Sequence, residues 1–265
     1  KKKNLKLPNF FASLRRIIMN KTAIIIPSRL DAKRLPNKPL KLINNKEMIL
    51  HVYEAAIKSN SGEVYVATPD QKIIEVVKNF GGNAVQTSSY HETGTDRVFE
   101  VFKETLNRKP NIIVNLQGDM PNIEPQEIKN LINYMNLGKC EIGTLASKLG
   151  SNSELEDENV VKVITKEKLK PQNFMEALDF VRENPKSKHQ VYHHIGIYGF
   201  TNESLQRFVN LKRSKLELNR KLEQLRAMEN DMSIHVGYIN FPPLSVDTEK
   251  DLIKVKKIME KNEQN

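Results

Sequence analysis

Short apolar segments alternate with amphipathic segments along the first half of the chain. β-Branched runs predict strands at 23–27, 63–68, 83–87, 111–117 and 142–148, and helical periodicity predicts helices at 46–59, 70–80, 95–108 and 125–136. This order is typical of repeated βαβ units, which build a mainly parallel, Rossmann-like sheet with helices on both faces. Ligands of such sheets bind at the carboxyl ends of the strands, so we expect the functional site there.

The second half of the chain has a more mixed pattern. It predicts strands at 160–165, 194–200 and 233–239, a long helix at 215–230 and a final helix from about 248. Neither an internal repeat nor a Pro/Gly-rich linker divides the sequence. We therefore predict one α/β domain over residues 21–265, with a small mixed elaboration of the sheet.

The first twenty residues stand apart from this pattern. Residues 1–20 contain no acidic side chain, carry several lysines and arginines, and reach Met19 just before the first predicted strand. A targeting peptide would be basic and acid-poor, but the apolar run is too short and broken for a secretory signal. We interpret residues 1–20 as a disordered or non-native extension, and expect deletion of 1–18 to leave stability and activity unchanged.

Composition excludes several classes of function. The net charge of +10 would attract polyanions, but the basic residues are spread along the whole chain without an aromatic-basic motif, so we expect no nucleic-acid partner. The longest apolar stretch, 23–27, suits a buried strand and not a membrane span. Cys140 is the only cysteine, which excludes an internal disulfide and a thiolate metal cage and fits a cytoplasmic location.

A basic loop directly follows the first predicted strand. Between Pro27 and Leu40 lie Arg29, Lys33, Arg34 and Lys38, and prolines restrict the same segment. Guanidinium and ammonium groups on a restricted loop suit the oxygens of a triphosphate, although basic loops are also common on solvated surfaces. The loop contains no glycine, so it is neither a Walker A loop nor a dinucleotide fingerprint.

This loop closely resembles the opening of 3-deoxy-manno-octulosonate (Kdo) cytidylyltransferases, and further similar motifs follow in the family's order over about residues 22–258. They are Gly94-Thr95-Asp96-Arg97, Val114-Asn115-Leu116-Gln117-Gly118-Asp119-Met120-Pro121, His194-Ile195-Gly196-Ile197-Tyr198-Gly199-Phe200, Leu222-Glu223-Gln224-Leu225-Arg226 and Ser245-Val246-Asp247-Thr248. The resemblance implies a nucleotidyltransferase that transfers CMP from CTP to Kdo, giving CMP-Kdo and pyrophosphate for lipopolysaccharide synthesis. It also implies Mg²⁺ as cofactor and a homodimer.

The resemblance assigns the reaction to four residues. Arg29 and Lys38 would hold the triphosphate, and Asp119 and Asp247 would bind Mg²⁺, which prefers carboxylate and phosphate oxygens. Locally, Asp119 follows a hydrophobic strand and could equally be a turn or helix-cap residue. Thr248 and Asp251 resemble a capping box, so the following helix does not require Asp247. Because the sequence places no histidine as a general base, we expect metal-assisted deprotonation of the sugar hydroxyl.

The same resemblance implies a set of substrate-binding residues: Ser28, Arg34, Thr95, Arg97, Gln117, Arg182, His194, Tyr198, Glu223 and Gln224. Arg97 or Arg182 would neutralise the sugar carboxylate. Thr95 could instead be a helix N-cap, and residues 223 and 224 could face solvent on a helix whose apolar side carries Leu222 and Leu225. The pair His193-His194 lacks a third ligand and does not predict a zinc site.

Several positions depart from the family pattern. Relatives carry Ser-Thr where this chain has Ala32-Lys33, glycine at Asn37, and an acid at Arg220; Asn tolerates a positive φ, so the change at Asn37 is mild. In the segment 177–182, Asp179 replaces an aromatic residue and Val181 a hydroxyl. We expect normal CTP binding, weak use of Kdo, and a gain from Val181→Ser with Asp179→Tyr. Two alternatives stay open: a cytidylyltransferase for another ulosonic or sialic-type acid, and a degenerate non-catalytic relative.

Overall fold

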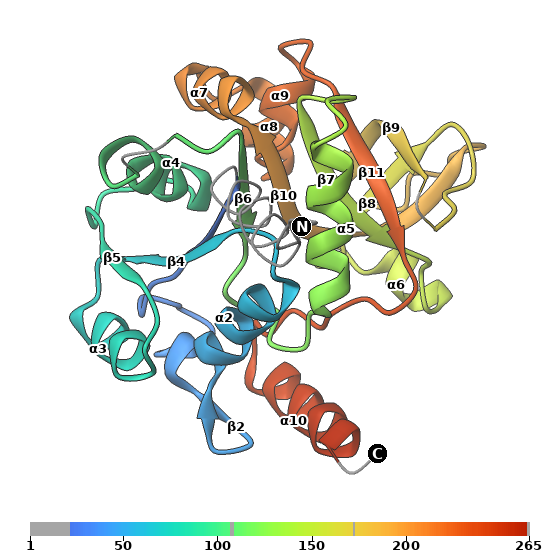
Figure 1. Cartoon of the computed structure of the whole chain (residues 1–265). Helices are drawn as coiled ribbons and strands as arrows, with labels where there is room; N and C mark the ends of the chain where they lie inside the picture. Colours follow the sequence, from blue (N-terminus) through green and yellow to red (C-terminus); the bar gives the residue numbers. More distant parts are fainter. Residues whose placement is uncertain (1–21, 107–108, 172, 264–265) are drawn as a thin grey trace, which may run out of the picture.

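The computed structural model describes residues 22–106, 109–171 and 173–263 (Figure 1), so the predicted extension 1–20 lies outside the described residues. The strands are β1 (Thr22–Pro27), β2 (Leu42–Ile43), β3 (Lys46–Glu47), β4 (Glu63–Thr68), β5 (Ala84–Gln86), β6 (Ile112–Leu116), β7 (Ile142–Ser147), β8 (Lys162–Thr165), β9 (Phe174–Val181), β10 (Gln190–Thr201) and β11 (Ile234–Ile239). The helices are η1 (Lys38–Leu40), α2 (Met48–Ser59), α3 (Gln71–Asn79), α4 (Gly94–Glu104), α5 (Pro125–Met135), α6 (Asn152–Glu156), α7 (Asn202–Asn210), α8 (Lys215–Arg220), α9 (Leu225–Met228) and α10 (Glu249–Glu263).

The main sheet has the strand order β5-β4-β1-β6-β10-β7-β11-β9-β8. Strands β5, β4, β1 and β6 are parallel, and β10 enters antiparallel between β6 and β7. The parallel half matches the βαβ units predicted from the sequence, and the second half is the mixed elaboration. The expected α/β fold class is confirmed.

The long strand β10 joins the two halves. Its first part pairs with β8 and its last part with β6 and β7, with an irregularity between Ile195 and Tyr198. Because β8 also pairs with β9, and β9 with β11, the pairings β10-β7-β11-β9-β8-β10 close into a ring. This ring carries His194 and Tyr198 beside the parallel strands.

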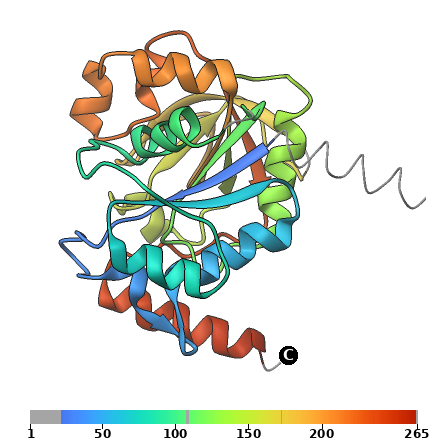
Figure 2. The same ribbon diagram turned by 60° about the vertical axis from the view of Figure 1, so that its left-hand side comes forward.

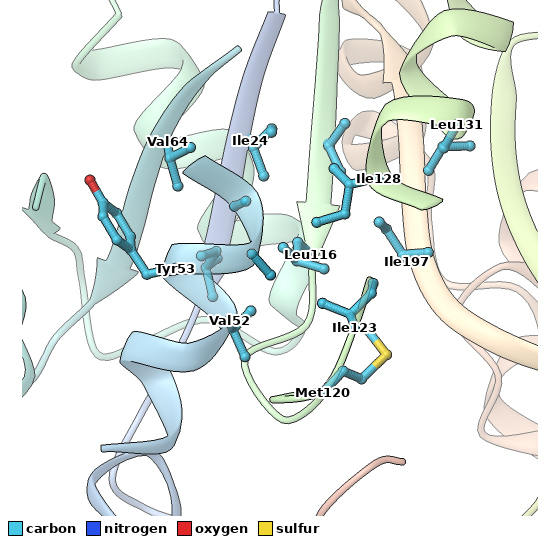
Figure 3. Close-up of a cluster of buried hydrophobic side chains, with 14 of the residues drawn as sticks. Ile24, Val52, Tyr53, Val64, Leu116, Met120, Ile123, Ile128, Leu131 and Ile197 are labelled. Atoms are coloured by element: carbon cyan, nitrogen blue, oxygen red, sulfur yellow. The ribbon is translucent and has the colours of Figure 1, made fainter. Parts of the chain in front are cut away.

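Alternating residues of β1 serve two separate cores. Ile24 and Ile26 pack with side chains of α2, α3 and α5, and Figure 3 shows Ile24 next to Val64, with Val52 and Leu116 lower in the same cluster. Ala23 and Ile25 face the other side, where α4, α7 and α9 cover the sheet. Figure 2 shows the sheet between these two layers of helices. Burial on both faces explains the continuous apolar run that the sequence shows.

A third, smaller core fixes the segments that form the site. Leu35 from the basic loop and Ile43 from β2 pack with Val246, from the segment before α10, and with Leu252 and Val255 of α10. The first loop and the segment before α10 are far apart in sequence, and this cluster holds them together.

The prediction of one continuous helix over 215–230 is wrong, because the structure has two short helices, α8 and α9, in this segment. Helix α8 ends at Arg220, because Lys221 has a φ of 54° in the left-handed region. A short turn leads into α9, and Leu222 and Leu225 are buried as expected. Helices α6 and α7 and the β2–β3 hairpin were not predicted, since they are short or lack a long apolar period.

Candidate functional site

A cavity of about 400 Å³ opens where β1 and β6 end. Pro27 ends β1 and is followed by Ser28 and Arg29, the segment 117–119 follows β6, and all of these residues line the cavity. This is the place that the sheet topology predicts for a ligand. The lining includes most of the basic loop, the start of α4 and both predicted metal ligands: Pro27, Ser28, Arg29, Asp31, Ala32, Lys33, Arg34, Leu35, Lys38, Pro39, His91, Glu92, Thr93, Gly94, Arg97, Gln117, Gly118, Asp119 and Asp247. We call it the phosphate cavity.

Asp119 and Asp247 converge on one cation in the phosphate cavity. Lys38 Nζ lies 3.0 Å from Asp119 Oδ2 and 3.1 Å from Asp247 Oδ1. Arg34 Nη2 lies 3.0 Å from the other oxygen of Asp247. The two carboxylates that the sequence assigns to Mg²⁺ are therefore neighbours, with an ammonium group between them.

The backbone brings these carboxylates together. The N–H of Val246 donates to the carbonyl of Asp119 at 2.9 Å, which ties the turn after β6 to the segment before α10. Thr248 and Asp251 form the predicted capping box, with Asp251 Oδ2 accepting from Thr248 N at 2.8 Å and Thr248 Oγ1 accepting from Asp251 N at 3.3 Å. The side chain of Asp247 is thus left for the cavity, as the sequence indicates.

The electrostatics of Lys38 fit a cation-binding position. Burial lowers the pKa of Lys38, but the nearby carboxylates of Asp119 and Asp247 outweigh this effect, and its pKa lies above the ordinary value. Among the described residues no three His, Cys, Asp or Glu side chains gather into a metal site. A divalent ion here would take two carboxylates from the protein, which is typical of Mg²⁺ when phosphate and water complete its shell.

The basic loop presents its cations around this pair. Arg29, Lys33 and Arg34 are exposed and line the phosphate cavity. Asn37 adopts a φ of 57°, which confirms that asparagine accepts the backbone conformation expected of glycine there. The loop is anchored by Leu35 in the third core and by the N–H of Leu30, which donates to Asp70 Oδ2 at 2.8 Å.

Arg97, on the first turns of α4, also lines the phosphate cavity. Its side chain is buried, and Nη1 donates to Thr87 Oγ1 and to the carbonyl of Ser88, the latter at 2.8 Å. Burial lowers its pKa, and the positive charge of Arg29 lowers it further. Arg97 therefore adds positive potential to the phosphate cavity while its Nη1 group stays bound to the protein.

A second, small cavity lies on the other side of the first turn of α4. Its lining combines polar and aromatic groups: Thr95, Ile142, Tyr198, Phe200, Phe208, Glu223 and Gln224. Within the described chain, Glu223 Oε1 and Gln224 Nε2 are buried without a hydrogen-bond partner. Buried polar atoms are rarely left unpaired, so these two indicate a ligand that supplies the missing partners. We call this the polar cavity.

Burial controls the charges of the polar cavity. It raises the pKa of Glu223 above the usual range, and it raises the pKa of Tyr198, with a further contribution from the charge of Glu223. The predicted solvent-facing alternative for residues 223 and 224 is wrong, because the break after α8 turns them inward.

His194 packs against Tyr198 and does not itself line the polar cavity. Burial lowers its pKa to about 3, so its imidazole is neutral. The hydroxyl of Thr144 donates to the carbonyl of Ile197 at 2.8 Å and lies 3.0 Å from His194 Nε2. Since that hydroxyl proton is already used, Nε2 is the donor toward Thr144, and Nδ1 is left as an acceptor. A neutral imidazole of this kind suits hydroxyl recognition better than carboxylate binding.

Hydrogen bonds connect the two cavities. Gln117 Nε2 donates to Asn115 Oδ1 at 3.1 Å, and Asn115 Nδ2 donates to Thr95 Oγ1 at 3.1 Å. Gln117 lines the phosphate cavity and Thr95 the polar cavity. The N-cap of α4 is Thr93 and not Thr95, because Asp96 N donates to Thr93 Oγ1 at 3.2 Å and Asp96 bonds back to Thr93. The side chain of Thr95 therefore does not cap the helix; it lies inside the protein and accepts from Asn115.

Most of the predicted site residues lie at these two cavities or beside them, and Arg182 does not. Its guanidinium donates to the carbonyls of Arg220, Glu158 and Lys221 at 3.1 to 3.3 Å, away from both linings. The sequence missed His91, Glu92 and Thr93 at the rim and Asn115 between the cavities. Asn115 lies inside a recognised motif, and only adjacency to such a motif could have indicated the other three.

The sheet has helices on both faces, and a basic loop and paired carboxylates lie at the carboxyl ends of its strands. This combination defines a nucleotidyltransferase. The family model named cytidylyltransferase matches residues 23–234. The 3-deoxy-manno-octulosonate cytidylyltransferase of Bartonella quintana (strain Toulouse) is 43% identical over 241 residues, which span 90% of this chain and 98% of that protein. The enzyme of the same name from Brucella ovis is 39% identical, over 88% and 93% of the two chains. The chain belongs to the 3-deoxy-manno-octulosonate cytidylyltransferase family of enzymes.

Solved structures agree with this assignment. A CMP:2-keto-3-deoxy-manno-octonic acid synthetase complexed with CTP has a TM-score of 0.83 at 34% identity, over 91% of this chain and 99% of that one. The UTP-bound UGPase of Acinetobacter baumannii has a TM-score of 0.66 at 11% identity, over 90% and 93% of the chains. The second likeness shows the fold alone.

Proposed function

We propose that this chain transfers CMP from CTP to Kdo in a Mg²⁺-dependent reaction, with the triphosphate in the phosphate cavity and the sugar in the polar cavity. The observation that carries the proposal is the convergence of Asp119 and Asp247 on a cation, next to buried polar atoms that lack partners. The product would be CMP-Kdo, an activated sugar for lipopolysaccharide synthesis.

The phosphate cavity supplies positioning and charge. Arg29, Lys33 and Arg34 would contact phosphate oxygens, and these groups bind phosphate well because they are permanently charged or strongly basic. Asp119 and Asp247 would hold Mg²⁺ in place of their contact with Lys38, which frees the Lys38 ammonium for the triphosphate. The ion, when bound, would neutralise charge on the phosphates and favour ionisation of the attacking hydroxyl.

The polar cavity would orient the sugar. In the proposed reaction the anomeric hydroxyl attacks the α-phosphorus of CTP, its oxygen forms the new P–O bond, and pyrophosphate leaves. Glu223, Gln224 and His194 Nδ1 would bind sugar hydroxyls. Because both cavities meet at the first turn of α4, the sugar and the α-phosphate can be adjacent, and such proximity contributes much of the rate of group transfer.

The sugar carboxylate would be recognised near Arg97 or by backbone and side-chain donors between the cavities. Arg97 retains a place in the lining of the phosphate cavity, whereas Arg182 is bound to carbonyl groups. A substrate role for Arg182 therefore stays a prediction with no contact to support it. The same chemistry would admit another ulosonic or sialic-type acid, and a panel of sugars separates these substrates.

The direct test is turnover of CTP with Kdo and a panel of other acidic sugars, measured as pyrophosphate release with and without Mg²⁺. We expect release that requires both Kdo and Mg²⁺. Release with a different acidic sugar alone would change the substrate, and no release with any sugar would contradict the proposed activity.

We also propose a cytoplasmic homodimer. Leu178 of β9 and Leu218 of α8 are large apolar side chains that are 44% and 51% exposed, and they offer apolar area for association. No helix in the described part of the chain is long and apolar enough to cross a membrane. Sedimentation equilibrium would test the dimer, and a concentration-independent monomer mass would contradict it.

A further inference from the structure

Two arginines hold the turn that brings Glu223 and Gln224 into the polar cavity. Arg182, which follows β9, donates to the carbonyls of Arg220 and Lys221 at 3.2 and 3.3 Å. These carbonyls belong to the end of α8 and to its left-handed cap residue, where unpaired acceptors favour a cation. The backbone just before Glu223 is thus bound to the end of β9.

Arg220 makes the reverse contact, from α8 to β9. Its Nη1 lies 2.7 and 2.9 Å from the two carboxylate oxygens of Asp179 and donates to the carbonyl of Phe180 at 3.1 Å. An arginine at the end of β9 therefore binds the end of α8, and an arginine at the end of α8 binds β9. An ion pair that also binds backbone carbonyls restrains the relative position of two elements more than an isolated surface pair does.

Strand β9 also reaches the opposite wall of the polar cavity, through His194. The ring of Phe180 meets the ring of His194 edge-on, with centroids 5.0 Å apart, and the rings of His194 and Tyr198 lie 5.4 Å apart. The residue pair Asp179-Phe180 thus binds the 220–224 turn through its polar atoms and β10 through its ring. The same two residues therefore help to position both walls of the polar cavity.

We propose that Asp179 and Arg220 are positioning residues that fix the Glu223–Gln224 turn against β10 and thereby set the affinity for the acidic sugar. Neither residue lines the phosphate cavity, so CTP affinity is independent of the pair. The inference rests on the proposed function for the identity of the sugar. Its second measurement, described below, does not depend on turnover.

The test compares Arg220→Gln and Asp179→Asn with a matched control. Lys46→Gln breaks an ion pair of similar exposure, Lys46 with Glu54 at 2.8 Å, on the β3–α2 side of the molecule. We expect the KM for Kdo to rise roughly tenfold in both test variants and to stay unchanged in the control, because contacting positions that share a network are energetically coupled. The KM for CTP should change less than about twofold in all three. Arg220→Lys, which retains the charge, should recover part of the loss.

The double variant Asp179→Asn with Arg220→Gln should be no worse than Arg220→Gln alone, since the two side chains act as one contact. Equal increases in both KM values, or additive losses, would overturn the inference. If the unmodified chain does not use Kdo, the proposed function fails, and amide hydrogen exchange over residues 221–226 decides the inference. Faster exchange in Arg220→Gln than in Lys46→Gln supports it, and equal exchange overturns it.

Discussion

The two cavities of the site differ in how their polar atoms are satisfied. In the phosphate cavity both carboxylates of the proposed metal site already contact a cation, Asp119 through Lys38 and Asp247 through Lys38 and Arg34. In the polar cavity, by contrast, Glu223 Oε1 and Gln224 Nε2 have no partner among the described residues. The first cavity is open and ionic, whereas the second is small, buried and mostly neutral.

This difference indicates two modes of recognition. Charged side chains that pair with each other in the free protein can exchange partners when Mg²⁺ and triphosphate enter. These side chains are already partly desolvated, so binding adds only a small desolvation penalty for them. Buried unpaired atoms instead demand a ligand of matching geometry, and a wrong sugar leaves them unsatisfied at a cost of about 1 to 3 kcal/mol each. The phosphate cavity should therefore govern rate and the polar cavity should govern choice of sugar.

The strongest way to break the comparison is to remove one carboxylate from the phosphate cavity. Asp119→Asn and Asp247→Asn should each lower kcat by about 100-fold or more while the fold is retained, because they remove charge from the proposed metal site and no core packing. Steady-state rates at saturating Mg²⁺ test this. Asp31→Asn, in the same cavity lining, is the control and should stay within about threefold of the unmodified rate. A near-normal rate in Asp119→Asn would remove the metal assignment.

The buried state of His194 can be tested by pH. Burial lowers the pKa of His194 to about 3 in the folded protein, against an ordinary value of about 6.5 in the unfolded chain. Between these two pH values the unfolded chain binds a proton at this residue and the folded protein does not. Stability from this group is therefore complete above pH 6.5 and is lost toward pH 3, by about 1.4 kcal/mol per pH unit. Urea unfolding of the unmodified chain and His194→Gln between pH 6 and pH 4 measures it. Identical slopes for the two proteins would show that His194 is not held neutral.

Gln224 separates ligand recognition from folding. Gln224→Met removes the unpaired donor and keeps a similar volume, so we expect the KM for Kdo to rise roughly tenfold and the KM for CTP to stay constant. The melting temperature should be unchanged or higher, because an unsatisfied buried polar atom is replaced by an apolar one. A lower melting temperature together with unchanged Kdo kinetics would assign Gln224 to the core and not to the sugar.

The sequence predicts the phosphate cavity better than the polar cavity. Asp119 and the basic loop follow strand ends, and Asp247 directly precedes a capping box, so local patterns place them at one edge of the sheet. Glu223 and Gln224 are different, because their orientation depends on the break at Lys221, a lysine in a left-handed conformation that no local pattern marks. Helical periodicity alone would have left both side chains in solvent.

The pairing of Asp179 with Arg220 shows a further limit of local analysis. The sequence presents them as two separate departures from the family pattern, 41 positions apart, and the structure shows that they contact each other. Asp179→Tyr would leave Arg220 without its carboxylate. The expected gain from Asp179→Tyr with Val181→Ser is therefore reversed, and we now expect that double variant to use Kdo less well.

The smallest effect should come from the backbone of the basic loop. Asn37 sits between Arg34 and Lys38 with a φ of 57°, where a residue with a Cβ is strained and asparagine less so. Asn37→Ala should lower the free energy of unfolding by about 1 kcal/mol, whereas Asn37→Gly should change it by less than that. Asn45, with a φ of 62° in the β2–β3 turn, provides the control: Asn45→Ala should lose similar stability but leave the KM for CTP unchanged. We expect Asn37→Ala, unlike Asn45→Ala, to raise the KM for CTP. If it leaves that KM unchanged, triphosphate binding does not require the loop conformation that Leu35 and Asp70 anchor.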